Sequence, residues 1–507
     1  MEPSIPFLLV VGFLVSLAAL VFLVWSISSG QFSMGPGSAS VIFEPGEHGE
    51  DPASDPGAED SRPSLDLSGR RAVLVLLGTA IAWLLLGSFA GLASSLKFHL
   101  PDLWTAHAWA TFGRVRPLHL NLVTYGWTSL ASLGVGLWLM PRLLKTPLRG
   151  ERYALAGAAL WNGALVAGTW ALLAGHSQGE EWLEFPFAVD LALSVAGALL
   201  GIPLLLTLRE RKVRHLYVST WYIGAALLWF PWLFLIANWP GAFHGVSQAV
   251  VNWWFAHNVL GLWITPFSLG AAYYFIPKIL GRPIHSYQLS LLGFWSLALF
   301  YSQAGVHHLI GGPVPNWLVA VSVVHSVAMV IPVIAVAINH HMTMKGHFRR
   351  LLDSPTLRFV VTGSVLYTVV SLQGCLEAVP SFNRLVHFTH YTVAHAHLGV
   401  YGFASMILFG SVYFIGPRVT GRDWPSPSWI SAHYWLVTLG LALYVVSMTV
   451  GGVLQGLVLL DPEATFLQSL AQTKPYFVWR TAGGAMMTAG HLIFGLHFVR
   501  LLLGRSR

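Results

Sequence analysis

Two histidines separated by a single residue, His395 and His397, open a long apolar stretch of the chain. On a helix, side chains two residues apart point about 200° away from each other. The two imidazoles therefore cannot both bind the same metal ion, although each could bind a different one. An isolated pair of this kind is more often two buried histidines that donate to backbone carbonyls, so the rest of the sequence must decide between these interpretations.

The composition assigns these histidines to a membrane protein. Hydrophobic residues make up 55% of the 507 residues and charged residues only 10%. A water-soluble protein of this size carries more charges, so we predict an all-α, polytopic membrane helix bundle. The net charge of +7 does not call for a nucleic-acid partner, because basic residues in cytoplasmic loops account for it. The single cysteine, Cys375, excludes intrachain disulfides and Cys-ligated zinc or iron–sulfur clusters held by this chain alone.

The chain divides into three predicted parts. Residues 1–30 contain an apolar run without a basic n-region or a small-residue cleavage site, which predicts a retained transmembrane helix. Residues 31–69 are rich in Gly, Pro, Ser and acidic residues and predict a flexible linker. Residues 70–507 form the predicted core, with about twelve apolar runs near the ~20 residues that a bilayer requires. These runs are 72–94, 118–140, 153–175, 186–208, 217–238, 250–276, 289–311, 317–338, 359–379, 395–415, 430–457 and 478–502.

Basic residues gather in alternate loops. They lie in 141–152, 209–215, 278–282, 345–350, 418–422 and the tail 500–507. By the positive-inside rule these loops are cytoplasmic, so the N-terminus is predicted outside and the linker and the C-terminus inside. Arg114 and Arg116 are exceptions in an outer loop, and they indicate anionic groups there, such as heme propionates.

This topology predicts six histidines from four helices at one depth, in the outer third of the membrane. They are His119, His257, His307, His308, His395 and His397. Intramembrane ionisable groups are costly and usually functional, and neutral imidazole binds iron and copper well. Six imidazoles could serve a six-coordinate heme, a five-coordinate heme and a three-histidine copper. His307 and His308 could share the copper if their helix end is irregular.

Hydroxyl groups extend from these histidines toward the cytoplasm. Tyr301 lies seven residues before His308, about two helical turns away on nearly the same side, where a phenol could supply a proton and an electron. Below it lie Thr265, Tyr273, Tyr287 and Ser290. With trapped water they could relay protons, although each could equally hydrogen-bond its own helix. The remaining histidines, including His340 and His341, are interpreted as interfacial or structural.

Six segments, in chain order, closely resemble the catalytic subunit of cbb3-type cytochrome c oxidases, a branch of the heme–copper oxidases. They read FGRVRPLHLN, NWWFAHNVLGLW, GAAYYFIPK, RPIHSYQLS, QAGVHHL and VAHAHLG. The resemblance implies low-spin heme b on His119 and His397, high-spin heme b3 on His395, and copper B on His257, His307 and His308. It further implies that Tyr301 is cross-linked to His257 and that Arg116 meets a heme propionate. It implies a proton channel through Thr265, Tyr273, Tyr287 and Ser290.

The resemblance implies a respiratory terminal oxidase of the bacterial inner membrane. Such an enzyme reduces O2 to water at heme b3 and copper B, with electrons from cytochrome c and protons from the cytoplasm, and translocates protons. No Cys-x-x-Cys-His motif is present, so separate membrane-anchored c-type cytochrome subunits are expected as partners. Gln373 stands where the family has a glutamate and Gly293 where it has a histidine, which affects proton handling but not metal ligation. The first ~45 residues, with FLVWSISSGQF before an acidic stretch, resemble the small one-helix assembly protein of these oxidases and suggest a natural fusion.

Two other interpretations remain at this point. A nitric oxide reductase on the same scaffold would carry a non-heme iron, which favours an added glutamate ligand. The position one turn after His257 is Gly261, no glutamate lies between His257 and His308, and Tyr301, which those reductases lack, is present. A transporter would contain no heme, and a heme subunit that only relays electrons would contain no copper.

Overall fold

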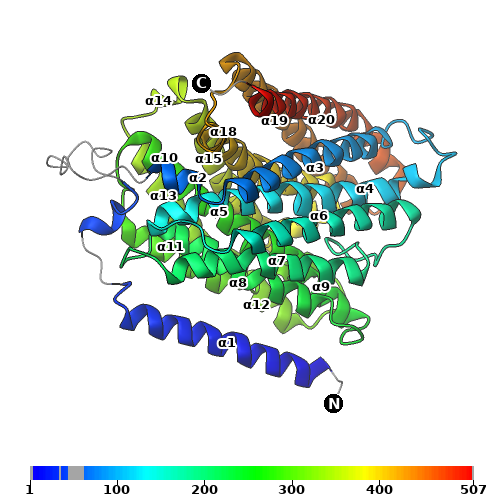
Figure 1. Ribbon diagram of the computed structural model, residues 1–507. Helices are drawn as coiled ribbons and strands as arrows, with labels where there is room; N and C mark the ends of the chain where they lie inside the picture. The colour runs from blue at the N-terminus through cyan, green and yellow to red at the C-terminus, as the bar shows by residue number, and fades with distance from the viewer. Residues whose placement is uncertain (1–3, 33–35, 44–61, 505–507) are drawn as a thin grey trace, which may run out of the picture.

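The computed structural model describes residues 4–32, 36–43 and 62–504, and these residues form a bundle of helices without a β-strand (Figure 1). The predicted all-α membrane bundle is confirmed. Within the described ranges, eleven helical runs are long and apolar enough to cross a membrane. They are α3 (Arg70–Leu96), α4 to α5 (Phe112–Leu144), α6 (Glu151–Ala174), α7 (Phe187–Arg209), α8 (Val218–Ala237), α9 to α10 (Val246–Leu280), α12 to α13 (Asn316–Met344), α15 (Pro355–Glu377), α17 to α18 (His390–Thr420), α19 (Pro427–Leu460) and α20 (Phe466–Leu503).

The run predicted at 289–311 is shorter than expected as an α-helix. Helix α11 (Tyr287–Tyr301) has 15 residues, and the chain continues as the 3₁₀ segment η5 (Ala304–Leu309). Fifteen α-helical residues rise only about 22 Å, less than the ~30 Å hydrocarbon core. The helix end near His307 and His308 is therefore irregular, which is the condition under which both histidines could share one copper.

Three spanning runs change to π-helix in their middle. The π-helical segments are η3 (Leu122–Thr128), η4 (Val259–Ile264) and η6 (Leu398–Ser405). Each begins one to three residues after a histidine: His119, His257 and His397 respectively. Such wide turns are rare and occur frequently at functional sites. Nothing in the composition of these segments predicts them.

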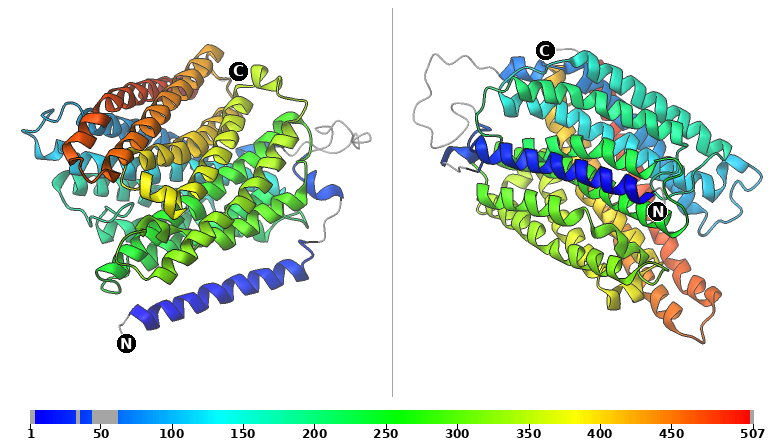
Figure 2. Two further views of the ribbon diagram at one scale, coloured as in Figure 1. Left: turned by 180° about the vertical axis from the view of Figure 1, so that it is seen from behind. Right: turned by 90° about the horizontal axis from the view of Figure 1, so that it is seen from below.

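Helix α1 (Ser4–Ser28) lies outside the bundle, and its carboxyl end is on the side that carries α14 (Arg350–Asp353) and the C-terminal end of α20 (Figures 1 and 2). Apolar side chains along α1 are exposed, among them Val10, Leu20 and Val21. This pattern is typical of a helix whose surroundings are lipid.

Part of the predicted linker is packed onto the bundle. The short helices η1 (Pro36–Ala39) and α2 (Arg62–Leu67) belong to it. Ile42, Phe43 and Leu65 are buried, and the Asp66 carboxylate forms a buried ion pair with Arg142. These parts of 31–69 are thus more ordered than we predicted, because they bury apolar side chains. Residues 44–61 of the predicted linker lie outside the described residues.

Candidate metal centres

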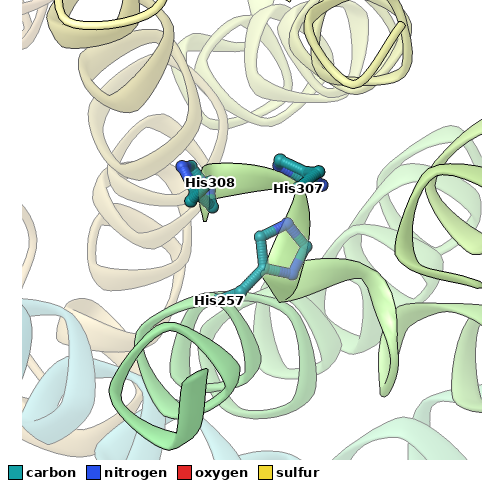
Figure 3. Close-up of side chains that lie close together, drawn as sticks. All are labelled: His257, His307 and His308. Atoms are coloured by element: carbon teal, nitrogen blue, oxygen red, sulfur yellow. The ribbon is translucent and has the colours of Figure 1, made fainter. Parts of the chain in front are cut away.

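Three histidines converge at the end of α9 (Val246–Asn258) and on η5. His257, His307 and His308 each offer a ring nitrogen, and these nitrogens lie within 4.8 Å of one another (Figure 3). The ring centroids of His257 lie 4.9 Å from His307 and 5.6 Å from His308, and those of His307 and His308 lie 4.4 Å apart. The structure thus brings together the three residues for which the resemblance implied copper.

Neighbouring side chains orient these rings. His307 Nδ1 lies 2.8 Å from Ser326 Oγ, which leaves Nε2 for a metal ion. The His308 ring stacks on Trp253 with a centroid distance of 4.2 Å. His257 Nδ1 is buried and has no hydrogen-bond partner among the described residues. A buried polar atom without a partner is costly, so this donor set fits a metal that prefers imidazole nitrogen, as copper does.

Tyr301 packs beside His257 because position 261 has no side chain. The Tyr301 and His257 ring centroids are 4.6 Å apart. A β-carbon at Gly261 would lie 1.7 Å from Cε1 of Tyr301, closer than any real contact. The tyrosine ring therefore occupies the space in which a glutamate at position 261 would have to lie, so this backbone and a ligand carboxylate at 261 are incompatible.

A second group consists of two histidines whose rings face each other. The rings of His119 on α4 (Phe112–Asn121) and His397 on α17 (His390–His397) are nearly parallel, at 15°, with centroids 6.2 Å apart. The Nδ1 atoms are held by main-chain carbonyls, His119 by Gly87 at 2.7 Å and His397 by Val393 at 2.9 Å. Both Nε2 atoms are therefore left to bind a metal. Metal–imidazole bonds are about 2.0 Å long, so the centroid distance of 6.2 Å leaves room for one iron between the two rings. The pair fits a six-coordinate heme.

His395 contacts two acceptors on α15. Its Nδ1 lies 3.4 Å from Gln373 Oε1 and 3.4 Å from Glu377 Oε1. The amide that replaces the family's carboxylate is thus accompanied by a buried carboxylate one helical turn later. Glu377 was missed in the sequence, although its spacing of four residues from Gln373 is the signal for a shared helix face.

The arginines near the histidines differ in whether their guanidinium groups already have partners within the protein. Arg116 donates two hydrogen bonds to Glu181, the shorter 2.6 Å, so its guanidinium already has a carboxylate partner. Arg114 donates to the Leu173 carbonyl at 2.7 Å. Arg480 on α20 was not considered in the sequence analysis. Its Nε donates to Tyr444 Oη, the Tyr444 ring packs 4.4 Å from His397, and Arg480 Nη1 is buried without a partner among the described residues.

A buried carboxylate supports the helix that carries His119. Asn121 Nδ2 donates to Glu184 Oε2 at 2.8 Å. Burial, with the nearby charge of Glu181, raises the pKa of Glu184 to about 7.

The predicted hydroxyl series is only partly connected through the protein. Ser290 Oγ donates to the carbonyl of Tyr287 in its own helix, at 2.6 Å, the alternative that we had left open. Tyr287 Oη donates to the Leu216 carbonyl at 2.5 Å, whereas Tyr273 Oη is buried without a partner among the described residues. Thr265 begins α10 (Thr265–Leu280) and is half-buried.

Further polar groups surround Tyr273. Its ring lies 4.4 Å from His340, which is 1% exposed and is bound through Nδ1 to Ser364 Oγ at 2.7 Å. Tyr222 stacks on Tyr273 at 5.9 Å, and a β-carbon at Gly293 would lie 3.5 Å from Tyr222 Oη. His340, which we had interpreted as interfacial or structural, therefore belongs to the surroundings of the hydroxyl series. Buried hydroxyls of this kind are commonly bridged by water.

Comparison with known proteins shows the family of the chain. The sequence model of the family described as "Cytochrome C and Quinol oxidase polypeptide I" matches residues 71–486. The chain belongs to this family. It is 32% identical over 429 residues to "Cbb3-type cytochrome c oxidase subunit CcoN1" of Stutzerimonas stutzeri, covering 82% of this chain and 90% of that protein. It is also 32% identical over 422 residues to "Cytochrome c oxidase subunit 1" of Rhodobacter capsulatus, covering 79% of each chain.

A solved structure shares the fold. The cryo-EM structure of a heme–copper terminal oxidase dimer superposes with a TM-score of 0.67 at 16% sequence identity, covering 89% of this chain and 85% of the other. The chain is therefore subunit I of an oxidase enzyme, as the resemblance implied, and its family implies heme and copper as cofactors.

Proposed function

We propose that the chain is the catalytic subunit of a cbb3-type terminal oxidase, which reduces O2 to water with electrons from cytochrome c and protons from the cytoplasm. In this proposal the His119 and His397 pair holds low-spin heme b and His395 holds high-spin heme b3. His257, His307 and His308 hold copper B. When bound, these groups supply electron transfer and O2 binding. The side chains of this chain hold and orient them and deliver protons.

The observation that carries the proposal is the packing of Tyr301 against His257 over Gly261. The short centroid distance of 4.6 Å supports the cross-link that the resemblance implied between these two side chains. It holds a phenol at the three-histidine site, where Tyr301 can give up a proton and an electron during O2 reduction. The same packing is incompatible with the glutamate that a nitric oxide reductase would need at this position.

Protons would reach Tyr301 from the C-terminal side of the bundle. We assign the path to Tyr287, Ser290, Tyr273 and Thr265, and the imidazole of His340 joins it because its ring packs on Tyr273. Translocation of protons across the membrane is part of the proposal.

Two heme-facing roles follow from the arrangement of charges. Arg480, with its buried Nη1 atom beside Tyr444 and His397, is suited to bind a heme propionate. Arg116 is proposed for the same role from the resemblance. Its guanidinium would then bind both the propionate and the Glu181 carboxylate. Gln373 Oε1 accepts from His395 Nδ1, and the Glu377 carboxylate lies 3.4 Å from the same nitrogen, so both side chains are placed to orient that imidazole.

We further propose the membrane arrangement and the partners. The N-terminus lies outside and the C-terminus in the cytoplasm of a bacterial cell, since the basic loops are cytoplasmic. Membrane-anchored c-type cytochrome subunits deliver the electrons. Residues 1–30 form a transmembrane helix of assembly-protein type, joined by residues 31–69 to the core of residues 70–507. Unchanged heme and copper content after deletion of residues 1–69 would contradict the assembly role.

Turnover of the purified complex tests the proposed reaction. We expect cyanide-sensitive O2 uptake driven by reduced cytochrome c, and we expect Tyr301→Phe to lower it at least about 100-fold with heme and copper content unchanged. A Gly224→Ala variant is the matched control, because a β-carbon there meets nothing within 4 Å. Faster consumption of nitric oxide than of O2 would contradict the proposal.

A further inference from the structure

The end of α1 and the residues after it pack against the bundle. We call the described residues 22–32 and 36–43 the N-terminal strap. Its central contact is the Gln31 side chain, which is 3% exposed. Gln31 Nε2 donates to the Arg214 carbonyl, and the Leu216 amide donates to Gln31 Oε1, both at 3.0 Å. This two-point contact fixes the loop 210–217 between α7 and α8 in one register.

Aromatic rings fill the space beside this contact. Phe22 packs on Trp221 and Trp295, with centroid distances of 5.4 and 6.1 Å. Phe32 packs on the same two rings at 6.4 and 6.0 Å. Trp221 lies on α8 and Trp295 on α11, and these two rings also pack on each other at 5.9 Å, so the strap adds to an existing contact between the two helices. The packing of these four aromatic rings is a substantial apolar contact.

The second half of the strap is held by two lysines. Lys278 Nζ donates to the Ile42 carbonyl at 2.7 Å, and Lys145 Nζ donates to the Phe43 carbonyl at 3.2 Å. Ile42 and Phe43 are 4% and 7% exposed. The main-chain carbonyls at the end of the strap therefore contact α10 and the residue that follows α5 (Ser129–Leu144). The Ile42 and Phe43 side chains at the same end are buried.

The loop that the strap fixes also holds the hydroxyl series. The Leu216 carbonyl accepts from Tyr287 Oη at 2.5 Å and from Trp221 Nε1 at 3.0 Å. The next residue, Tyr217, donates through Oη to the Tyr273 carbonyl at 2.9 Å. One peptide segment thus contacts the strap through the Leu216 amide and the tyrosines through the Leu216 carbonyl and Tyr217.

We propose that the N-terminal strap is a tethered, permanently docked cover at the mouth of the tyrosine path, and that it fixes the Tyr287 hydroxyl by holding loop 210–217. The docking stands on the contacts above. Its consequence for proton uptake rests on the proposed oxidase function. If the segment acted only during assembly, it would not need to remain on the finished enzyme.

Cleavage of the tether tests the docking in the full-length chain within its complex. A specific protease site is inserted in residues 44–61 and an affinity tag is placed before residue 1. After cleavage in detergent, we expect the core to be retained by the tag through the strap contacts. The Gln31→Ala, Phe32→Ala double variant should release the core, whereas Val21→Ala, a change at a 61% exposed side chain, should not. Release of the wild-type core after cleavage would overturn the proposal.

Hydrogen exchange adds a local measurement that does not depend on activity. Gln31→Ala removes the acceptor of the Leu216 amide, so its exchange should be faster by about fivefold or more. Gln31→Glu keeps an acceptor oxygen and should leave that amide largely protected. Unchanged exchange in Gln31→Ala would contradict the assigned contact.

Proton uptake during a single turnover tests the consequence. In the cleaved double variant we expect a changed rate of proton uptake with heme and copper content unchanged. An unchanged rate in an active, strap-free core would overturn the assigned role at the path mouth. A core without oxidase activity in the uncleaved wild type would instead refute the proposed function and leave the docking result intact.

Discussion

The two groups of histidines in this protein are held in different ways. In the pair, His119 and His397 bind main-chain carbonyls through Nδ1. In the trio, His307 binds the hydroxyl of Ser326, and His257 Nδ1 has no partner among the described residues. Main-chain acceptors cannot be removed by a substitution, whereas a hydroxyl can. The pair is therefore fixed by its helices, and the trio depends on the side chains around it.

The angles between the rings agree with this difference. The rings of the pair are 15° from parallel, as suits two ligands on opposite sides of one iron. In the trio, His257 lies at 89° to His307 and at 58° to His308. His257 comes from α9, and the adjacent His307 and His308 lie on the 3₁₀ segment η5, where both rings lie close to His257. We therefore expect substitutions beside the trio to have larger effects than matched substitutions beside the pair.

The largest effect is expected at Gly261. Gly261→Ala introduces a β-carbon where Tyr301 lies, so the tyrosine must leave His257. We expect turnover to fall at least about 100-fold, as for a misplaced reactive group, with loss of copper and retention of the low-spin heme signal. Metal analysis and optical spectra check this, with Gly224→Ala as the control. Retained copper and activity would show that the trio is less dependent on packing than we infer.

A matched pair of substitutions tests the difference in support directly. Ser326→Ala removes the partner of His307 Nδ1 and should weaken copper binding by about 10- to 100-fold. Val393→Ala leaves the carbonyl that holds His397 in place and should not alter heme b content. Copper titration with a chelator and heme quantification measure the two outcomes. Equal losses in both variants would remove the distinction.

The arginines provide a smaller test on the side of the pair. Arg480→Ala removes a cation near His397, which should lower the midpoint potential of the low-spin heme, on the order of 60 mV for ~1.4 kcal/mol of lost charge interaction. Arg116→Ala should shift it less, because Glu181 already neutralises that arginine. Redox titration followed by optical spectroscopy distinguishes the two. A larger shift from Arg116 would reassign the propionate contact to it.

His395 is supported by side chains, as the trio is, but through longer contacts. Hydrogen bonds to a carboxylate are stronger than those to an amide, although 3.4 Å is a long contact for either. We expect Glu377→Gln to shift the iron–histidine vibration of the high-spin heme and to slow turnover by about tenfold or less. Gln373→Leu should have the smaller effect. Resonance Raman spectra of the reduced enzyme would contradict this order if only Gln373→Leu shifted the band.

The smallest effect is a pH dependence of the helix that carries His119. Because burial raises the pKa of Glu184 from 4.5 to about 7, the folded protein binds this proton more tightly than the unfolded chain. This contribution to stability is therefore present below pH 4.5 and is lost as the pH rises to about 7. Thermal unfolding of Glu184→Gln should show a flatter profile in this window. A profile equal to that of the wild type would assign the pH dependence elsewhere.

The sequence analysis predicted the helix bundle and the residues of both histidine groups. Helix-length apolar runs and the alternation of basic loops carry that information locally, and motifs such as QAGVHHL contain their ligands within a few residues. The span count differed at α11 because an apolar run shows hydrophobicity but not where an α-helix ends. The π-helical turns were missed for the same reason, since they change the hydrogen-bonding pattern and not the composition.

Two of the residues that were missed make their contacts with a different helix. Arg480 contacts Tyr444, and His340 contacts Tyr273, only because the helices that carry them pack side by side. No spacing within one helix indicates such a contact. Glu377 is different, because its distance from Gln373 is one helical turn and could have been noticed. The buried histidines His433 and His491 also have tyrosine partners, Tyr413 and Tyr401.

The measurement that tests the account most directly is the heme and metal content of the purified complex, in the wild type and in His307→Ala. We predict two b hemes and one copper held by each copy of this chain, and loss of the copper alone in the variant. Non-heme iron in place of copper, or copper that persists when His307 is removed, would contradict the assignment of the trio as the copper site.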